Sequence, residues 1–374
     1  MNRLTSIEIH GFKSIRELKD FPLDALTVLV GANGAGKSNF VGFFRALSHL
    51  SSQHLQTYLL EDVGGANATL FDGAAVTRSI GACLTFKTVA GVNQYRFSLS
   101  HGAGDVLYFD DEAFRFLSAA KGDIADAQWT TLGQGNRESE LGPHAARVKA
   151  HGKKTAGVIH SLLRNCRVYQ FHNTSGTARI KARWNVEDNH LLREDGANLS
   201  AFLLRMRIHE LAYYHRIVNT VRLIAPFFDD FVLEPIEGSI LLQWRERGTD
   251  LLFNASQASD GMLRMIALVT LLLQPPKGLP WVLILDEPEL GLHPMGLDVI
   301  AGLVRSTSLS RQVIVATQSP RFVDAFKPEE IVVVERRGRE SLFRRLDPEP
   351  LKEWLEEYST GELWEKGVIG GRPS

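Results

Sequence analysis

The sequence predicts an α/β fold in which buried strands alternate with helices and a smaller antiparallel β region is attached. Short apolar runs, such as 26–30 and 281–285, alternate with longer segments of helical periodicity, such as 259–273. A glycine-rich loop of the form G-x-x-x-x-G-K-S spans 31–38, between the first of these strands and a helical segment. Strand, glycine-rich loop and helix in this order are typical of a layered phosphate-binding fold.

The elements of the first third follow from local patterns. Residues 5–10 alternate polar and apolar side chains and predict a short strand, and 26–30 predict a buried one. Residues 38–50 predict a helix with an apolar face. Several short alternating runs between residues 80 and 110, separated by Gly and Asn, are typical of antiparallel hairpins.

The rest of the chain predicts a second set of alternating elements. Residues 121–154 are polar and contain glycines, which favours a long loop, and 197–223 predict one or two helices. The other expected elements are strand-like runs within 231–253, strands at 281–285, 312–316 and 331–334, and helices at 259–273 and 294–304. We therefore expect a head formed by 1–119 and 226–374, with a loop and helical insertion at 120–225.

Composition excludes several classes of protein. The 374 residues are 44% hydrophobic, and the net charge of −1 does not indicate a nucleic-acid-binding protein. The cysteines Cys83 and Cys166 form no CxxC pair, and the longest apolar run, 265–273, is too short for a membrane span. We expect a cytoplasmic protein without a membrane partner. Basic stretches at 164–183 and 205–222 leave nucleic-acid binding open, although a solvated basic surface is the favoured reading of them.

The glycine-rich loop predicts a phosphate site. Glycines let the backbone turn so that its N–H groups point at phosphate oxygens, and the dipole of the next helix adds positive potential. Lys37 would meet the β- and γ-phosphates, and the Ser38 hydroxyl would bind Mg²⁺. The residues expected to contact nucleotide are Asn33, Gly34, Ala35, Gly36, Lys37 and Ser38.

An acidic pair follows the buried run 281–285. A strand that ends in a carboxylate opposite a phosphate loop suits Mg²⁺ coordination, which is the expected role of Asp286. The next residue, Glu287, could orient and deprotonate an attacking water.

Ser259 and Gly261 stand immediately before the helical segment that ends at residue 273. Ser259 is a natural helix N-cap, and this alone would explain it. A serine and a glycine at a helix N-terminus could also form a second anion site. Two facing chains could use such a site, if each supplied it to the ATP of its partner.

The order of these motifs resembles the heads of ABC ATPases, and within them the RecF, SMC and OLD branch. The run Ile7–Ile15 before the loop resembles the first strand of that branch, and Glu287–Pro294 resembles its stand-alone ATPases, often encoded in bacterial defence loci. The resemblance implies an ABC-type P-loop head with an antiparallel β subdomain. It also implies ATP and Mg²⁺ held between two head-to-tail copies of the chain.

Further site residues are implied only by the resemblance. Lys13 matches a basic residue that contacts nucleotide, although a surface lysine is an equal alternative, and Gln170 is a candidate metal ligand or a strand residue without a role. Gln318 stands where the family has its switch histidine. Because an amide cannot become cationic near neutral pH, slow hydrolysis is expected. His293 is either a contact across the dimer or a helix-start residue.

The resemblance implies a nucleotide-driven switch that regulates a separate effector in antiphage defence. Only 56 residues follow Gln318, too few for the fused TOPRIM nuclease of OLD-type proteins, so a nuclease effector would be another polypeptide. The alternative is a DNA-binding repair clamp of the RecF type. The near-neutral charge and the lack of a long heptad run favour the first reading.

Overall fold

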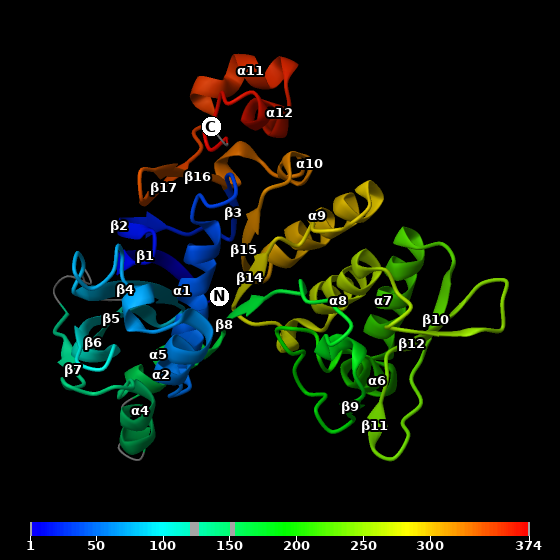
Figure 1. The fold of residues 1–374 in the computed structure, drawn as a ribbon, viewed down its shortest axis with the longest axis horizontal. Helices are drawn as coiled ribbons and strands as arrows, with labels where there is room; N and C mark the ends of the chain where they lie inside the picture. The colour runs from blue at the N-terminus through cyan, green and yellow to red at the C-terminus, as the bar shows by residue number, and fades with distance from the viewer. Residues whose placement is uncertain (1, 120–126, 150–153, 373–374) are drawn as a thin grey trace.

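A six-stranded, mostly parallel sheet lies at the centre of the computed structural model, which describes residues 2–119, 127–149 and 154–372 (Figure 1). In spatial order its strands are β17 (Glu340–Arg345), β16 (Ile331–Arg337), β3 (Leu26–Val30), β15 (Gln312–Thr317), β14 (Val282–Asp286) and β8 (Cys166–Tyr169). All neighbours are parallel except β17, which pairs antiparallel with β16. Strands β3, β14 and β15 are buried throughout, as expected for a parallel sheet covered on both faces.

Two hydrophobic cores cover the two faces of this sheet. Val28 and Val30 of β3 point into one core, and Leu29 points into the other, because successive side chains of a strand face opposite ways. The first core contains α8 (Asp260–Leu273) and α9 (Pro294–Ser308). The second contains α1 (Lys37–Ser51). The helices α1 and α8 therefore lie on opposite faces of the central sheet (Figure 1).

A second six-stranded sheet, antiparallel throughout, packs against α1 (Figure 1). In spatial order its strands are β2 (Ile15–Pro22), β1 (Arg3–Phe12), β4 (Ser79–Thr88), β5 (Gly91–Gly102), β6 (Val106–Ser118) and β7 (Thr130–Thr131). Phe43 of α1 stacks on Phe97 of β5, with the ring centroids 6.5 Å apart. The predicted α/β class with an antiparallel β subdomain is confirmed.

A helical and β lobe packs beyond α8 (Figure 1). Its helices are α6 (Leu199–His209) and α7 (Leu211–Ile224), so the segment expected to hold one or two helices forms two, interrupted at Glu210. Its strands are β9 (Trp184–Asn185), β10 (Phe228–Val232), β11 (Ser239–Ile240), β12 (Gln243–Glu246) and β13 (Leu252–Asn254). The hydroxyl of Tyr214 donates to Asp230 at 2.7 Å and ties α7 to β10.

The segment expected as a long loop, 121–154, contains a helix, α4 (Leu141–Lys149), in its described part. Residues 121–126 and 150–153 of that segment lie outside the described residues. Gly142 and Pro143 make α4 hard to recognise from sequence, although proline is tolerated in the first turn, where its missing N–H costs little. Packing of the buried Leu141 favours the helix.

The segment 120–225, expected as an insertion into the head, can be compared with the strands and cores that the structure shows. Within 120–225, α5 (Thr155–Arg164) joins the core around α1, and β8 pairs in parallel with β14 of the head. At least β8 therefore belongs to the central sheet. Further helices are α2 (Leu55–Tyr58), a π-helical turn η1 (Leu59–Val63), α3 (Ala66–Thr69), α10 (Pro320–Val323), α11 (Lys352–Glu357) and α12 (Thr360–Glu365). Among the described residues, none of the helices is long and apolar enough to cross a membrane.

Candidate functional site

Four neighbouring parallel strands bring the candidate residues to one edge of the central sheet. The glycine-rich loop follows β3, Gln318 follows β15, Asp286 and Glu287 lie at the end of β14, and Gln170 follows β8. The carboxyl ends of parallel strands meet at the same edge, where α/β proteins bind their ligands. Motifs up to 287 residues apart in sequence, from Gly31 to Gln318, therefore converge at one site.

The glycine-rich loop has the backbone that its sequence requires. Gly34 has a φ of 78° and Gly36 has a φ of 115°, and residues with a side chain rarely adopt such positive φ values. A Cβ on Gly36 would lie 2.0 Å from the Ser341 hydroxyl, which itself donates to the Ala35 carbonyl at 2.6 Å. Gly36 is also the N-cap of α1, and Ser38 is exposed in the first turn. The loop thus presents exposed polar groups at a helix N-terminus.

Lys37 lies under this loop. Only 4% of the residue is exposed, and Nζ donates to the carbonyls of Gly31 at 2.6 Å and Ala32 at 3.1 Å. Burial lowers the pKa of Lys37, while the nearby carboxylates Glu287, Glu289 and Asp286 oppose that change. An anionic phosphate could take the place of these neutral carbonyls and form stronger, charge-assisted hydrogen bonds with Lys37.

Asp286 accepts a network of polar contacts. Its Oδ2 accepts from Gln170 Nε2 at 3.1 Å and lies 3.6 Å from a guanidinium nitrogen of Arg45 on α1. The same Arg45 group donates to Gln170 Oε1, and His172 bonds to Gln170 and to the Asp286 carbonyl. Burial raises the pKa of Asp286, with Arg45 and His172 acting in the opposite direction. The structure therefore brings Gln170 into contact with Asp286.

These groups fit a magnesium ion in their chemistry. The Ser38 hydroxyl, the Asp286 carboxylate and the Gln170 amide oxygen are hard oxygen donors, which Mg²⁺ prefers. Across the described ranges there is no group of three or more His, Cys, Asp or Glu side chains that could hold a metal. A site with few protein carboxylates is characteristic of Mg²⁺ bound together with nucleotide phosphates.

Hydrogen bonds connect the segment that carries Glu287 to the segment that carries Gln318. Glu287 has a φ of 45°, and its N–H donates to the Ala316 carbonyl of β15 at 2.8 Å. The buried Glu289, two residues further on, accepts from the main-chain N–H of Gln318 at 3.0 Å. The loop after β14 and the end of β15 are thus held side by side.

Ser259 is exposed at the start of α8, where its hydroxyl accepts from the Met262 N–H at 3.2 Å. A Cβ on Gly261 would lie 2.1 Å from the Gly291 carbonyl, so the close approach of α8 to the loop after β14 requires glycine there. His293 is the N-cap of α9 and accepts from the Met295 N–H at 3.4 Å. The helix-start role of His293 is thus present in the structure.

Arg264 of α8 links the serine-containing helix to both sides of the site. Its guanidinium donates to the carbonyls of Phe171 at 3.2 Å and His172 at 3.0 Å, next to Gln170. It also donates to the Leu290 carbonyl at 3.2 Å, in the loop after Glu287. Movement of α8 would therefore act on the Gln170 and Glu287 segments together.

Two polar hollows flank the glycine-rich loop. One, of about 570 Å³, is lined by Lys13, Asn39 and Arg336, and the other, of about 540 Å³, by Asn33, Arg336 and Arg372. Burial lowers the pKa of Lys13, with Arg45 adding to the effect. Lys13 therefore shares a polar hollow with Asn39, the residue that follows the glycine-rich loop, and with the cationic Arg336.

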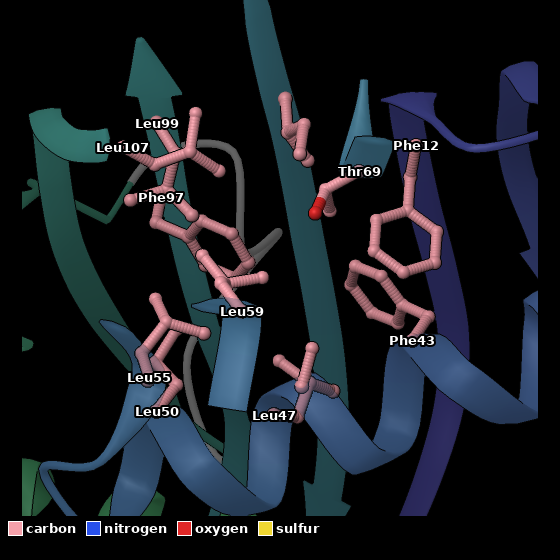
Figure 2. Close-up of a pocket in the computed structure, with 12 residues that line it drawn as sticks. Phe12, Phe43, Leu47, Leu50, Leu55, Leu59, Thr69, Phe97, Leu99 and Leu107 are labelled. Atoms are coloured by element: carbon pink, nitrogen blue, oxygen red, sulfur yellow. The ribbon is translucent and has the colours of Figure 1, made fainter. Parts of the chain in front are cut away.

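A third cavity is apolar and lies elsewhere, between α1 and the antiparallel sheet (Figure 2). Its volume is about 20 Å³, and Phe12, Phe43 and Phe97 are among the side chains around it. Its only polar lining side chain, Thr69, already donates to the Gly65 carbonyl at 2.9 Å. This cavity is a packing gap of the core, too small and apolar for a nucleotide.

This fold and the convergence of motifs at one sheet edge define a P-loop nucleotide-binding head of the ABC type, and solved SMC heads are similar to it in fold. An SMC head bound to the C-winged helix domain of ScpA matches with a TM-score of 0.58 and 17% identity, over 94% of this chain and 99% of that one. The SMC head of Pyrococcus furiosus, with an extended coiled coil and bound to the C-terminal domain of ScpA, matches with a TM-score of 0.53 and 15% identity, over 96% and 99%. The head of Pyrococcus yayanosii matches with 0.52 and 13%, over 96% and 99%.

The chain belongs to the family described as "AAA domain, putative AbiEii toxin, Type IV TA system", whose profile matches residues 128–324, more than half of the chain. A comparison with curated proteins finds no match.

Four residues at the site were not predicted from sequence: Arg45, His172, Arg264 and Glu289. Arg45 had a usable signal, since it follows Ser38 by seven residues and so lies on the same face of α1. His172 is two residues after Gln170, which places both on one side of an extended segment. Arg264 and Glu289 had no such signal, because their contacts join segments far apart in sequence.

The buried charge of Asp286 predicts a stability effect that depends on pH. The contribution of a carboxyl whose pKa is raised by folding is fully present below its usual pKa of 3.8, and it is lost as the pH rises through the folded pKa. Asp286→Asn removes the buried charge. In EDTA at pH 8 the variant should unfold at a higher temperature than the wild type, by about 2 °C.

Thermal unfolding followed by circular dichroism from pH 4 to pH 8 would measure this difference, which should shrink toward pH 4. Asp298→Asn is the matched control, because this side chain is 66% exposed. An Asp286→Asn protein less stable than the wild type at pH 8 would contradict the prediction.

Proposed function

We propose that the protein is an ATP-hydrolysing dimeric switch. The observation that carries this proposal is the strand order β3–β15–β14–β8, which brings Lys37, Gln318, Glu287 and Gln170 to one edge of the sheet. An enzyme that transfers a phosphoryl group to water needs a phosphate cradle, a metal site and a group that orients the water. In this proposal, these residues would supply all three.

The roles follow from position and chemistry. Backbone N–H groups of residues 33–38 and the Lys37 ammonium would hold the phosphates, and Lys13 would lie at the nucleoside side. Ser38, Asp286 and Gln170 would hold Mg²⁺, which neutralises phosphate charge when bound. Glu287 would take a proton from the attacking water, and Gln318 would donate a hydrogen bond toward the γ-phosphate. Because Gln318 carries no charge, turnover is expected to be slow.

Two features support a site shared between two copies. The helix α1, which follows the phosphate loop, and the helix α8, which begins after Ser259, pack on opposite faces of the central sheet. Ser259 is exposed and caps its helix, so its N-terminus is free to meet an anion from outside. In a head-to-tail homodimer, Ser259 and Gly261 would face the ATP of the partner.

We further propose that the switch regulates a separate effector in a bacterial defence system, with a nuclease, such as one of TOPRIM type, as the expected effector. The description of the family, which names a putative toxin of a type IV toxin–antitoxin system, supports a defence role. Purification from native expression should recover a second polypeptide with the ATPase. The RecF-like alternative predicts instead DNA binding with a steep dependence on salt, because phosphate contacts release counterions.

A mixed-dimer experiment tests the shared site. Lys37→Ala and Ser259→Arg should each be inactive as homodimers. In the heterodimer, one site combines both defects, and the other combines the intact phosphate loop of the Ser259→Arg chain with the intact Ser259 of the other chain. Doubly tagged, co-expressed heterodimers should regain up to about half of the wild-type ATP turnover, because one of two sites is intact.

The control is a heterodimer of wild type and Lys37→Ala, which also keeps one intact site and reports coupling between the sites. If this control hydrolyses ATP and the heterodimer of the two variants does not, the shared-site geometry is wrong. A site built within one chain could not be restored by mixing.

A further inference from the structure

Glu289 is a buried carboxyl group without an assigned role. It is 8% exposed and lies two residues after Glu287. Its Oε1 accepts from the Thr317 hydroxyl at 2.6 Å and from the main-chain N–H of Gln318 at 3.0 Å. The Thr317 hydroxyl in turn accepts from the Ser319 N–H at 3.1 Å. One carboxyl oxygen thus organises the peptide that carries Gln318.

The other oxygen, Oε2, is buried and has no hydrogen-bond partner within the described part of the chain. Burial raises the pKa of Glu289, and Glu287 adds to this effect, against the bonds from Thr317 and Gln318. A buried polar atom without a hydrogen-bond partner destabilises the folded protein. A different residue at this position would avoid that cost, so a glutamate is expected here only if its acceptor oxygen is needed. The buried Oε2 therefore carries a free-energy cost that packing alone does not explain.

The contacts of Glu289 join the two segments that carry the proposed chemistry. The Glu287 N–H bonds to the Ala316 carbonyl at 2.8 Å, which is a backbone link between the loop and β15. Glu289 adds a side-chain link one residue further along β15. With both links in place, the loop of Glu287 and the peptide of Gln318 can move only together.

We propose that Glu289 is a positioning residue that holds Gln318 in register with Glu287. This inference rests on the proposed function and deepens it, since it assigns the element that couples the water-orienting acid to the γ-phosphate sensor. Glu289 acts through the hydrogen bonds that Oε1 accepts. It does not exchange a proton with the attacking water.

Four variants separate these roles. Glu289→Ala removes the acceptor, and Glu289→Gln keeps an amide oxygen in its place. Thr317→Val removes the donor with little change of shape, and Thr317→Ser restores it. Displacement of an active group by about 1 Å can cost on the order of 100-fold in rate. We expect Glu289→Ala and Thr317→Val to lower kcat by about 10- to 100-fold, with the Kd for ATP changed less than about threefold.

Glu289→Gln and Thr317→Ser should keep most of the turnover. The double variant Glu289→Ala/Thr317→Val should be no worse than the more impaired single variant, because both changes break the same link. Additive losses would show that the residues act separately and would overturn the proposal. A Glu289→Gln protein as inactive as Glu287→Gln would also overturn it, since the charge or the proton would then matter.

Hydrogen exchange at the Gln318 amide supplies a readout that does not depend on turnover. This amide should exchange faster in Glu289→Ala and at the native rate in Glu289→Gln, with and without ATP. A wild-type protein that hydrolyses no ATP would end the proposed function, yet the exchange rates would still show whether Glu289 holds Gln318. Native exchange in Glu289→Ala would overturn the positioning role even if hydrolysis were confirmed.

Discussion

Lys37→Ala is expected to weaken ATP binding by on the order of 100-fold or more. Removal of one partner from a buried, hydrogen-bonded charge pair costs about 2–5 kcal/mol, which corresponds to about 30-fold to several thousand-fold in Kd. Lys37 is 4% exposed, and its hydrogen bonds within the described residues go to the carbonyls of Gly31 and Ala32. These weaker bonds would be exchanged for phosphate contacts when ATP binds.

Equilibrium titration with a fluorescent ATP analogue measures the effect. Lys19→Ala is the matched control, because Lys19 is 66% exposed on β2 and pairs with Glu17. Circular dichroism should show that Lys37→Ala is folded, since alanine also removes two hydrogen bonds from the loop. Unchanged affinity in a folded Lys37→Ala protein would end the assignment of the phosphate site.

Glu287→Gln should bind ATP with nearly native affinity and lose turnover by about 10²- to 10⁴-fold. General base catalysis contributes factors of this size, and an amide keeps the shape and hydrogen bonding of the carboxylate without its basicity. The backbone bond from Glu287 N–H to Ala316 does not depend on the side chain, so the loop should keep its position. Because bound ATP persists, the variant should accumulate as a dimer.

Phosphate release and light scattering, with and without ATP, measure turnover and dimerisation in one preparation. Glu329→Gln is the control. Glu329 is exposed and lies between α10 and β16, before the start of β16 and so at the edge of the sheet opposite to the site. Normal phosphate release from Glu287→Gln would remove this residue from the mechanism. Loss of turnover without an ATP-dependent dimer would leave Glu287 as the base but would argue against the closed homodimer.

Local sequence patterns predicted much of the fold. The antiparallel β region and the alternation of strands and helices could be predicted, because the spacing of apolar residues indicates which face of an element is buried. The helix α4 was missed, because Gly142 and Pro143 disguise its first turn and packing decides its formation. Strand β2 was also missed. Its buried residues, Ile15, Leu18 and Phe21, recur at every third position instead of every second, and its pairing with β1 shifts register between Leu18 and Phe21.

By itself, the sequence determined the chemistry at the edge of the central sheet: a glycine-rich loop with Lys37 and Ser38, and a carboxylate pair at the end of a buried strand. Those motifs are local, because their function needs a turn, a helix start or a strand end within a few residues. Only the tertiary structure decided which distant segments meet there. Parallel pairing of β3, β15, β14 and β8 brings Gln170 to Asp286 and the buried Glu289 to Gln318. Contacts of this kind depend on strand order, and no local pattern of apolar and polar residues encodes that order.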